Sequence, residues 1–249
     1  MAFTFPKPMT WAYMPLFEKI AYYKTILNES YSPFVDKLEA KRIVKEMCGD
    51  DIKVADVKRI LDDPDDFSEA DIDTHSMIKA SHGCGWNISM AADTNVADVK
   101  ALLHSWNHTY SASNEAQYKY IAPRFFIEEK VNDKEIGITN VAITYMITCV
   151  RGSPITFIVR KQSEQSCYDM NKRVLGIRAT QPVTPFLLPA EFDTMIQLAK
   201  KLSKPFEFVR IDLYIGHDGI YLSEFTFTPR SGFMLYSMQK EKEFGKLWK

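Results

Sequence analysis

Apolar residues recur at helical spacing in several parts of the chain. Residues 15–27 carry one such stripe, with a proline where the first helical turn tolerates it. A second helix is predicted to begin at Asp36, whose side chain is suited to capping it. The same spacing predicts helices over three further ranges, which are 54–61, 96–110 and 191–203.

Other segments are rich in β-branched and aromatic residues. Residues 76–80 and 124–131 are predicted strands, and residues 81–87 form a turn that contains two glycines. Two hairpins are also predicted, one pairing 141–150 with 155–160 and the other pairing 206–215 with 220–228. Helices mixed with hairpins indicate an α+β protein with largely antiparallel sheets.

The second hairpin carries acids within otherwise apolar strands. Side chains alternate between faces along a strand, so one face of the first strand is predicted to hold Arg210, Asp212 and Tyr214. One face of its partner is predicted to hold Ile220, Leu222, Glu224, Thr226 and Thr228. A carboxylate inside such a strand needs a cation or a hydrogen-bond donor. Mg²⁺ with bound phosphate is one solution, whereas solvent exposure or a salt bridge to Arg210 or Arg230 is the plainer one.

Composition narrows the function classes. The 249 residues have a formal net charge of −1, which gives no general attraction to nucleic acid. The four cysteines are scattered without CxxC spacing, as is typical of a reducing compartment. No apolar run approaches the length of a membrane span, and the N-terminus has no signal-peptide pattern. A cytoplasmic protein is therefore predicted.

Lys79 ends a short strand and precedes the glycine-containing turn. Backbone N–H groups in such a turn can surround phosphate oxygens, and a lysine adds a point charge. The HGCG sequence at 82–85 is neither a Walker A motif nor a dinucleotide fingerprint, so this segment alone favours a surface loop over a phosphate-binding one.

The order of the motifs along the chain carries more information than any one of them. They are FEKI at 17–20, VDK at 35–37, IKASHGCGWNI at 78–88, Trp106, EAQYKYIAPRFFIEEKV at 115–131, YMITCVRG at 145–152 and FVRIDLYIGHDGIYLSEFTFTPRSG at 208–232. This series resembles the ATP-grasp ligases, and within them the TupA-like branch linked to teichuronopeptide synthesis. The resemblance implies an ATP-grasp fold in which two α+β lobes clamp ATP. The lobes are expected at 36–125 and 126–249 after a helical lead-in at 1–35, with the N-terminal pre-grasp domain reduced or absent.

The resemblance also implies roles for individual residues. Lys37 and Lys79 would contact phosphate, and Arg210 would stabilise charge on the transferring group, so Arg210 and Lys79 are the catalytic candidates. The flap over the triphosphate would include Ser81, His82, Gly83 and Gly85. The adenine hinge would consist of Glu128, Glu129, Lys130 and Val131, with Glu135 or Asp133 holding the ribose. Mg²⁺ would be bound by Asp212, Glu224 and Thr226.

The activity implied is an ATP-dependent carboxylate–amine ligase that works through an acyl phosphate. Its substrates would be an amino acid and a uronic-acid or peptide carboxylate in surface polysaccharide or glycan synthesis. Two alternatives stay open, a phosphotransferase and a degenerate ATP-binding partner subunit, because Met146 and Thr226 depart from patterns of this branch and of other ATP-grasp enzymes. Candidate anchors for an anionic substrate are Arg160, Arg173 and Arg230, although each is also typical of a surface residue. Whether the protein forms a homo-oligomer is left open.

Overall fold

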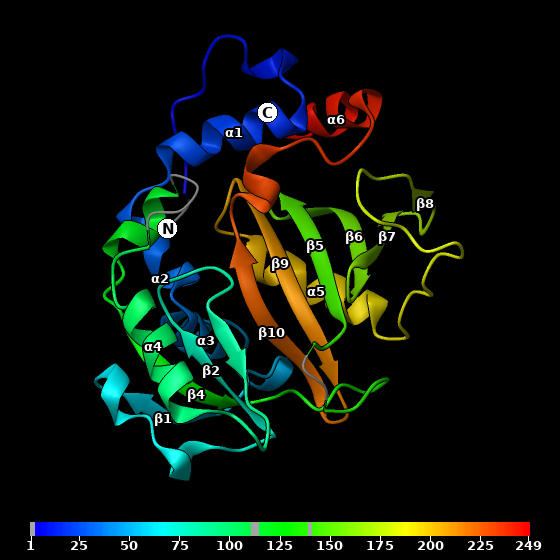
Figure 1. Ribbon diagram of the computed structural model, residues 1–249. Coiled ribbons are helices and arrows are strands. Elements are labelled where there is room, and N and C mark those ends of the chain that lie inside the picture. The colour runs from blue at the N-terminus through cyan, green and yellow to red at the C-terminus, as the bar shows by residue number, and fades with distance from the viewer. Residues whose placement is uncertain (1–2, 111–114, 139–140) are drawn as a thin grey trace.

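The computed structural model describes residues 3–110, 115–138 and 141–249. Its strands form two sheets, and the pairings described within these sheets are all antiparallel. Together with the helices around them, the sheets confirm the predicted α+β class (Figure 1). Over the described ranges, no helix has the length and apolar character that crossing a bilayer would require.

The smaller sheet has four strands in the order β1-β4-β2-β3. They are β1 (Val57–Leu61), β2 (Ser76–Ala80), β3 (Asn87–Ser89) and β4 (Phe125–Glu129). Helix α4 (Val96–Trp106) packs against this sheet, and Asn95 caps the helix by accepting the backbone N–H of Asp98. Ile78 and Leu103 are fully buried in the small core between the helix and the sheet.

The larger sheet has six strands in the order β10-β9-β5-β6-β7-β8. They are β5 (Thr144–Val150), β6 (Ser153–Lys161), β7 (Glu164–Asp169), β8 (Val174–Leu175), β9 (Phe208–Gly216) and β10 (Gly219–Thr226). Both predicted hairpins are confirmed. The β5–β6 turn has positive φ at Arg151 (49°) and Gly152 (74°), as a tight turn that matches the strand twist requires.

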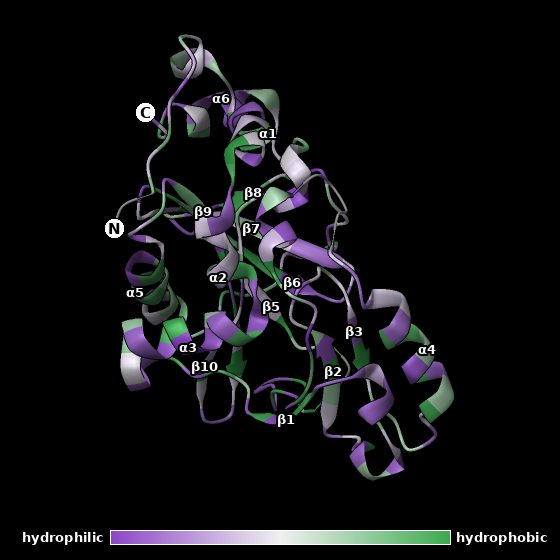
Figure 2. Ribbon diagram, turned by 90° about the vertical axis from the view of Figure 1, so that its left-hand side faces the viewer, coloured by the Kyte–Doolittle hydropathy of each residue, from purple (hydrophilic) through white to green (hydrophobic). Residues whose placement is uncertain are grey.

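One face of the larger sheet is covered by helices α3 (Lys37–Cys48) and α5 (Phe192–Ser203). These helices lie on one side of the sheet in Figure 2, and the strands β2 and β3 with α4 lie on the other side. The ring of Phe192 packs on that of Phe157 with centroids 4.8 Å apart. Asp36 caps α3 as predicted, because its carboxylate accepts the backbone N–H groups of Leu38 and Glu39.

Two helices from opposite ends of the chain pack together above the larger sheet. They are α1 (Leu16–Ile26) and α6 (Met238–Gly245), both at the top of Figure 1. The fully buried Lys19 joins them, since its ammonium donates to the carbonyls of Gly245 at 2.7 Å and Trp248 at 2.6 Å. The remaining short elements are α2 (Ser32–Val35) and 3₁₀ turns at Trp11–Tyr13, Glu29–Tyr31, Gly49–Asp51, Pro64–Asp66, Glu69–Asp71, Ala116–Tyr120 and Pro229–Gly232.

The predicted helix over 54–61 is wrong, because this segment contains strand β1. A run of eight residues is too short for apolar spacing to separate a helix from a strand. Pairing with β4 decides the conformation, and it leaves the charged side chains of Lys58 and Arg59 exposed at the sheet edge. There they form ion pairs with Asp73 and Asp71.

The β9–β10 hairpin departs from the predicted alternation at one point. A β-bulge between Leu222 and Glu224 shifts the register, so Leu222 pairs with Leu213 whereas Glu224 pairs with Asp212. Leu213 and Asp212 are neighbours in one strand and point to opposite faces. The prediction that Ile220 and Leu222 share a face with Glu224 is therefore wrong, because the extra residue reverses the alternation.

Candidate active site

A cleft of about 210 Å³ lies between the smaller sheet, helix α3 and the β9–β10 hairpin. It faces the side of the larger sheet that α3 and α5 leave uncovered. Seven predicted site residues line this cleft, and they are Lys37, Lys79, Glu128, Glu129, Lys130, Val131 and Glu224. The fold thus brings the predicted phosphate and hinge residues to one cavity with Glu224, whereas Asp212 and Thr226 do not line it.

Glu128 lies between two lysines in this cleft. Its carboxylate forms an ion pair with Lys79 and a second one, at 2.9 Å, with Lys41. Only 4% of the Glu128 side chain is exposed. Burial acts to raise the pKa of Glu128, but the two ammonium groups outweigh it and hold this pKa below its usual range. The pKa of Lys79 is raised, because attraction to Glu128 exceeds the cost of its burial.

Lys37 occupies the same cleft, and no carboxylate of the described residues lies at ion-pair distance from it. Its ammonium donates to the carbonyl of Ala80 at 3.0 Å and to that of Gly83. Burial lowers the pKa of Lys37, and the positive charge of Lys79 acts in the same direction. Lys37 therefore ties helix α3 to the glycine-containing loop and presents a poorly solvated positive charge to the cleft.

The loop after β2 requires glycine at two positions for different reasons. A Cβ atom on Gly83 would lie 2.4 Å from the ring of Trp86, which is stacked on Trp106 with centroids 5.8 Å apart. Gly85 has a φ of +72°, a region that residues with a side chain rarely adopt. The loop is thus shaped by close packing against an indole pair, with Gly83 supplying a carbonyl to Lys37.

Ser81 and His82 belong to the same loop but do not line the cleft. His82 is fully buried, where Nε2 lies 2.8 Å from the carbonyl of Trp106 and Nδ1 accepts the backbone N–H of Arg124. Burial lowers the pKa of His82, which favours the neutral ring. The histidine therefore holds the loop against α4 and β4 in this conformation.

Neither candidate for the ribose contact lines the cleft. The carboxylate of Asp133 accepts backbone N–H groups of Glu135, Ile136 and Ile143, and this residue is buried. Glu135 is exposed and forms an ion pair with Lys161. The structure therefore gives Asp133 a role in ordering the segment between β4 and β5, and Glu135 does not line the cleft.

The predicted metal residues form a network with Arg210. Asp212 and Glu224 lie opposite each other on adjacent strands, and Thr226 lies opposite Arg210 two pairs further on. Arg210 donates to both carboxylate oxygens of Asp212, at 2.6 and 2.5 Å, and to the hydroxyl of Thr226 at 3.1 Å. That hydroxyl donates to Glu224 at 3.2 Å. Burial raises the pKa of Asp212 to about 6, and the paired Arg210 opposes that rise.

The carboxylates of Glu224, which lines the cleft, and of Asp212, which is buried opposite it on the adjacent strand, are the oxygen donors that Mg²⁺ prefers. Glu224 keeps 40% of its side chain exposed toward this space, whereas Asp212 is fully engaged by Arg210. The residues fit a divalent cation, provided that one oxygen of Asp212 is released from the guanidinium. Thr226 uses its hydroxyl to link Arg210 and Glu224, so in this arrangement it acts as a connector between the two.

Lys41 is a site residue that the sequence analysis missed. It lines the cleft one helical turn after Lys37 and pairs with Glu128. Residues four apart on a helix lie on the same face, so the spacing between these two lysines carried the missing signal.

The three arginines proposed as substrate anchors separate into two groups. Arg160 and Arg230 line a second cavity on the same face of the larger sheet, and Arg160 lines the first cleft as well. Arg173 lines neither cavity. Met146, which lies opposite Asp212 on β5, lines the second cavity.

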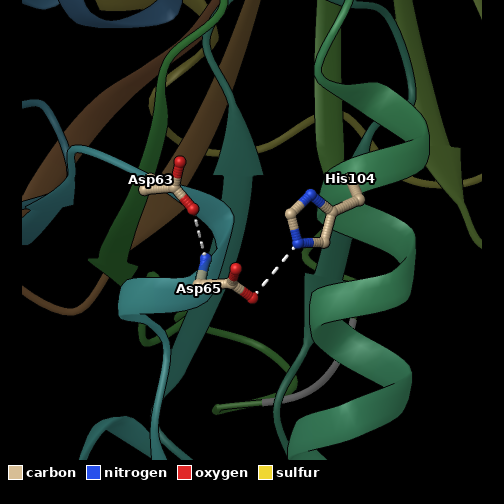
Figure 3. A group of neighbouring side chains, drawn as sticks. All are labelled: Asp63, Asp65 and His104. Carbon is tan, nitrogen blue, oxygen red and sulfur yellow. Dashed lines mark hydrogen bonds and ion pairs between the residues drawn. The ribbon is translucent and has the colours of Figure 1, made fainter.

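A group of side chains outside these cavities could in principle bind a metal ion. Asp63, Asp65 and His104 each offer one potential ligand atom, and these atoms lie within 4.8 Å of one another (Figure 3). All three residues are exposed. Asp63 accepts the backbone N–H of Asp65 at 2.8 Å, and Asp65 lies 3.1 Å from Nε2 of His104. These contacts tie the β1–β2 connection to α4, and they explain the grouping without a metal ion.

Two antiparallel sheets with lysines on one and paired carboxylates on the other define the ATP-grasp class of fold. The chain belongs to the TupA-like ATPgrasp family, which it matches over residues 18–248. The predicted family and fold are thereby confirmed. Among curated proteins, no sequence matches the chain significantly.

The solved structures that this chain resembles are distant from it in sequence. An L-amino acid ligase from Bacillus licheniformis has a TM-score of 0.50 at 7% identity, over 80% of this chain and 44% of that one. An N5-carboxyaminoimidazole ribonucleotide synthetase bound to ADP has a TM-score of 0.49 at 14% identity, over 80% and 46%. A D-alanine–D-alanine ligase from Bacillus anthracis bound to ATP has a TM-score of 0.46 at 12% identity, over 78% and 54%. The chain thus spans about half the length of these structures.

Proposed function

We propose that the protein is an ATP-dependent carboxylate–amine ligase. The observation that carries this proposal is the convergence of Lys37, Lys41 and Lys79 on one cleft whose opposite wall holds Glu224 and, behind it, Asp212. Three ammonium groups facing two carboxylates suit a triphosphate with a divalent cation. Val131 and its neighbours line the same cleft after β4, where their backbone would contact the adenine edge.

The residues present would act mainly by positioning and by electrostatic stabilisation. Lys79 and Lys37 would hold phosphate oxygens, and Arg210 would stabilise charge that develops on the transferring group. A substrate carboxylate oxygen would attack the γ-phosphorus of ATP, with ADP as the leaving group, to give an acyl phosphate. An amine would then attack its carbonyl carbon, so that inorganic phosphate leaves and an amide forms. Mg²⁺, when held by Asp212 and Glu224, would neutralise charge on the phosphate oxygens.

The loop over residues 81–86 would shield this reaction from water. It contributes the Gly83 carbonyl that now accepts from Lys37, so phosphate binding to this lysine would compete with a contact that holds the loop. Exclusion of water matters because an acyl phosphate hydrolyses readily in its presence.

Family membership supports a narrower form of the proposal. The substrates would be an amino acid, as the amine, and the carboxylate of a uronic acid or a peptide, in surface polysaccharide or glycan synthesis. The protein would act in the cytoplasm, where ATP is available.

Thermal unfolding with and without ATP–Mg²⁺ tests the nucleotide site. We expect ATP–Mg²⁺ to raise the unfolding midpoint of the wild type, since a ligand at a hundredfold excess over its Kd adds about 2.7 kcal/mol to the stability of the native state. Lys79→Met should lose most of this increase. Lys45→Met is the matched control, because Lys45 is exposed on α3 and does not line the cleft.

The reaction itself is tested by following ADP and phosphate in the presence of a carboxylate and an amine. Equal release of ADP and inorganic phosphate that depends on both substrates is expected for a ligase. Phosphate retained on the acceptor would identify a phosphotransferase instead. ATP-dependent stabilisation without ADP release over a broad acceptor screen would favour a nucleotide-binding partner subunit.

A further inference from the structure

A second cavity, of about 260 Å³, lies on the same face of the larger sheet as Asp212. It adjoins Arg210 and extends away from the nucleotide cleft toward the end of the sheet where α1 and α6 lie (Figure 1). We call it the chamber. Its volume is at the small end of ligand pockets, which commonly measure roughly 300–1,000 Å³.

The chamber has a roof built from both ends of the chain. Glu241 of α6 is buried, and its carboxylate accepts the backbone N–H groups of Phe17, Leu235 and Tyr236 at 2.9–3.0 Å. One glutamate thus joins α6, the first turn of α1 and the segment that precedes α6. The contacts of Lys19 with Gly245 and Trp248 hold the same helices together. The roof is therefore an ordered structure with its own polar bonds.

The walls of the chamber are largely apolar. The sheet contributes Met146, Ile158 and Phe208, and the roof contributes Leu16, Ile20 and Leu235. An apolar wall of this kind favours an occupant with hydrocarbon surface. Thr148, Gln165 and Tyr236 add polar groups elsewhere in the lining.

The charged groups of the chamber favour an anion. Over the described residues, Arg160 and Arg230 form no ion pair within 4 Å, and the polar contact recorded for Arg160 is donation to the Thr144 hydroxyl at 3.3 Å. The single acid among the lining residues described is Glu241, whose oxygens already accept three backbone N–H groups. Arg210 is neutralised by Asp212. The chamber thus keeps two positive charges with no carboxylate within 4 Å of them among the described residues.

The position of Arg160 between the two cavities indicates which end of a bound substrate would react. It lines both cavities, so it lies where the chamber meets the nucleotide cleft. A carboxylate held there would face the phosphate-binding lysines, while the rest of the molecule extended along the apolar wall.

We propose that the chamber binds the substrate carboxylate as part of an amino acid or short peptide whose carboxyl-terminal side chain is apolar. Arg160 holds the carboxylate, and the side chain packs on Met146 and Ile158. This inference rests on the proposed ligase function and chooses the peptide carboxylate over the uronic acid, because the wall next to Arg160 is formed by the paired Met146 and Ile158, which favour a hydrocarbon side chain over ring hydroxyls.

Calorimetric titration with small acids tests the proposal directly. The probes are N-acetyl-L-leucine, its neutral carboxamide and D-glucuronate, each titrated with and without a non-hydrolysable ATP analogue and Mg²⁺. We expect N-acetyl-L-leucine to bind at least about tenfold more tightly than either other probe, a difference of about 1.4 kcal/mol. Tighter or equal binding of glucuronate, equal binding of the carboxamide, or no saturable binding of the leucine probe in either condition would overturn the proposal.

Two variants and one control locate the binding. Arg160→Gln should weaken binding of N-acetyl-L-leucine at least about tenfold and leave the carboxamide unaffected. Phe17→Glu, which places a negative charge in a half-buried part of the chamber, should weaken binding of the acid more than binding of the carboxamide. Arg173→Gln should change nothing, because Arg173 is exposed and lines neither cavity. Unchanged affinity of both variants for the acid would overturn the assignment.

These titrations, taken together with thermal unfolding in the presence of ATP–Mg²⁺, distinguish this inference from the proposed function. Retained binding of N-acetyl-L-leucine together with no stabilisation by ATP–Mg²⁺ would reject the ligase and keep the chamber. Stabilisation by ATP–Mg²⁺ together with no binding of the acid would reject the chamber and keep the nucleotide site.

Discussion

The nucleotide cleft and the chamber beside it differ in whether their cationic side chains form ion pairs. In the cleft, Lys79 and Lys41 share the carboxylate of Glu128, so two of its cations are held in place by an internal anion. In the chamber, Arg160 and Arg230 form no ion pair among the described residues. The cleft is therefore preorganised but partly neutralised, and an incoming phosphate must compete with Glu128. The chamber keeps its charge available, at the cost of holding it beside apolar walls.

The largest expected effect comes from the carboxylates that face the cleft. Glu224→Gln should lower the rate of substrate-dependent ADP release by roughly 10²–10³-fold, the usual cost of removing one group that stabilises transition-state charge. It should also shift the Mg²⁺ titration of that rate to higher concentrations, because a neutral amide is a weaker ligand than a carboxylate. Glu29→Gln, in an exposed turn outside both cavities, is the control. A wild-type Mg²⁺ titration for Glu224→Gln would contradict the metal assignment.

A substitution in the roof should weaken binding in the chamber more than binding in the nucleotide cleft. Lys19→Met removes one donor from each of the carbonyls of Gly245 and Trp248, which keep the backbone N–H of Trp248 and the indole N–H of Trp11, and we expect it to lower the free energy of unfolding by about 1–3 kcal/mol. Urea unfolding measures this loss, with Lys45→Met as the control. Under conditions where the variant is folded, binding of N-acetyl-L-leucine should weaken more than the binding of ATP. Equal losses at both sites would mean that the roof does not act on the chamber alone.

Lys19 also makes the free energy of unfolding depend on pH. Burial, with a smaller contribution from Lys7, lowers the pKa of Lys19 to about 8, below the value of 10.5 for a free side chain. Between these two values the unfolded chain binds one proton more than the native protein, so this residue makes the free energy of unfolding rise with pH. We expect the gap between wild type and Lys19→Met in urea unfolding to widen from pH 8 toward pH 10. A gap that is constant over this range would show that Lys19 titrates normally.

The smallest effect is expected at the adenine hinge. Val131 is half-buried and lines the cleft, where the proposed contacts use its backbone. Val131→Ile should therefore leave ATP affinity within about tenfold of the wild type by calorimetry. A much larger loss would mean that the side chain at this position contacts the nucleotide and that the hinge is misplaced.

Local chemistry made some elements predictable from the sequence. The Asp36 cap and the two hairpins follow from short-range signals that the structure confirms. The bulge after Leu222 was not predictable, because nothing in an alternating strand marks where one residue will be left unpaired. Strand β1 was missed because its conformation depends on pairing with β4, which lies far along the chain. For the same reason the sequence did not place Glu128 between two lysines, although the spacing of Lys37 and Lys41 pointed to a shared helical face.

The bonds from Lys19 to Gly245 and Trp248 join residues 226 and 229 positions apart. Closing so long a loop is entropically costly and comes late in folding. Synthesis proceeds from the N-terminus, so α1 leaves the ribosome well before α6 exists to meet it. The strands and helices that surround the nucleotide cleft are complete by Thr226, whereas the roof also needs α6 and Trp248. A nascent chain can therefore complete the elements around the cleft before the roof of the chamber forms.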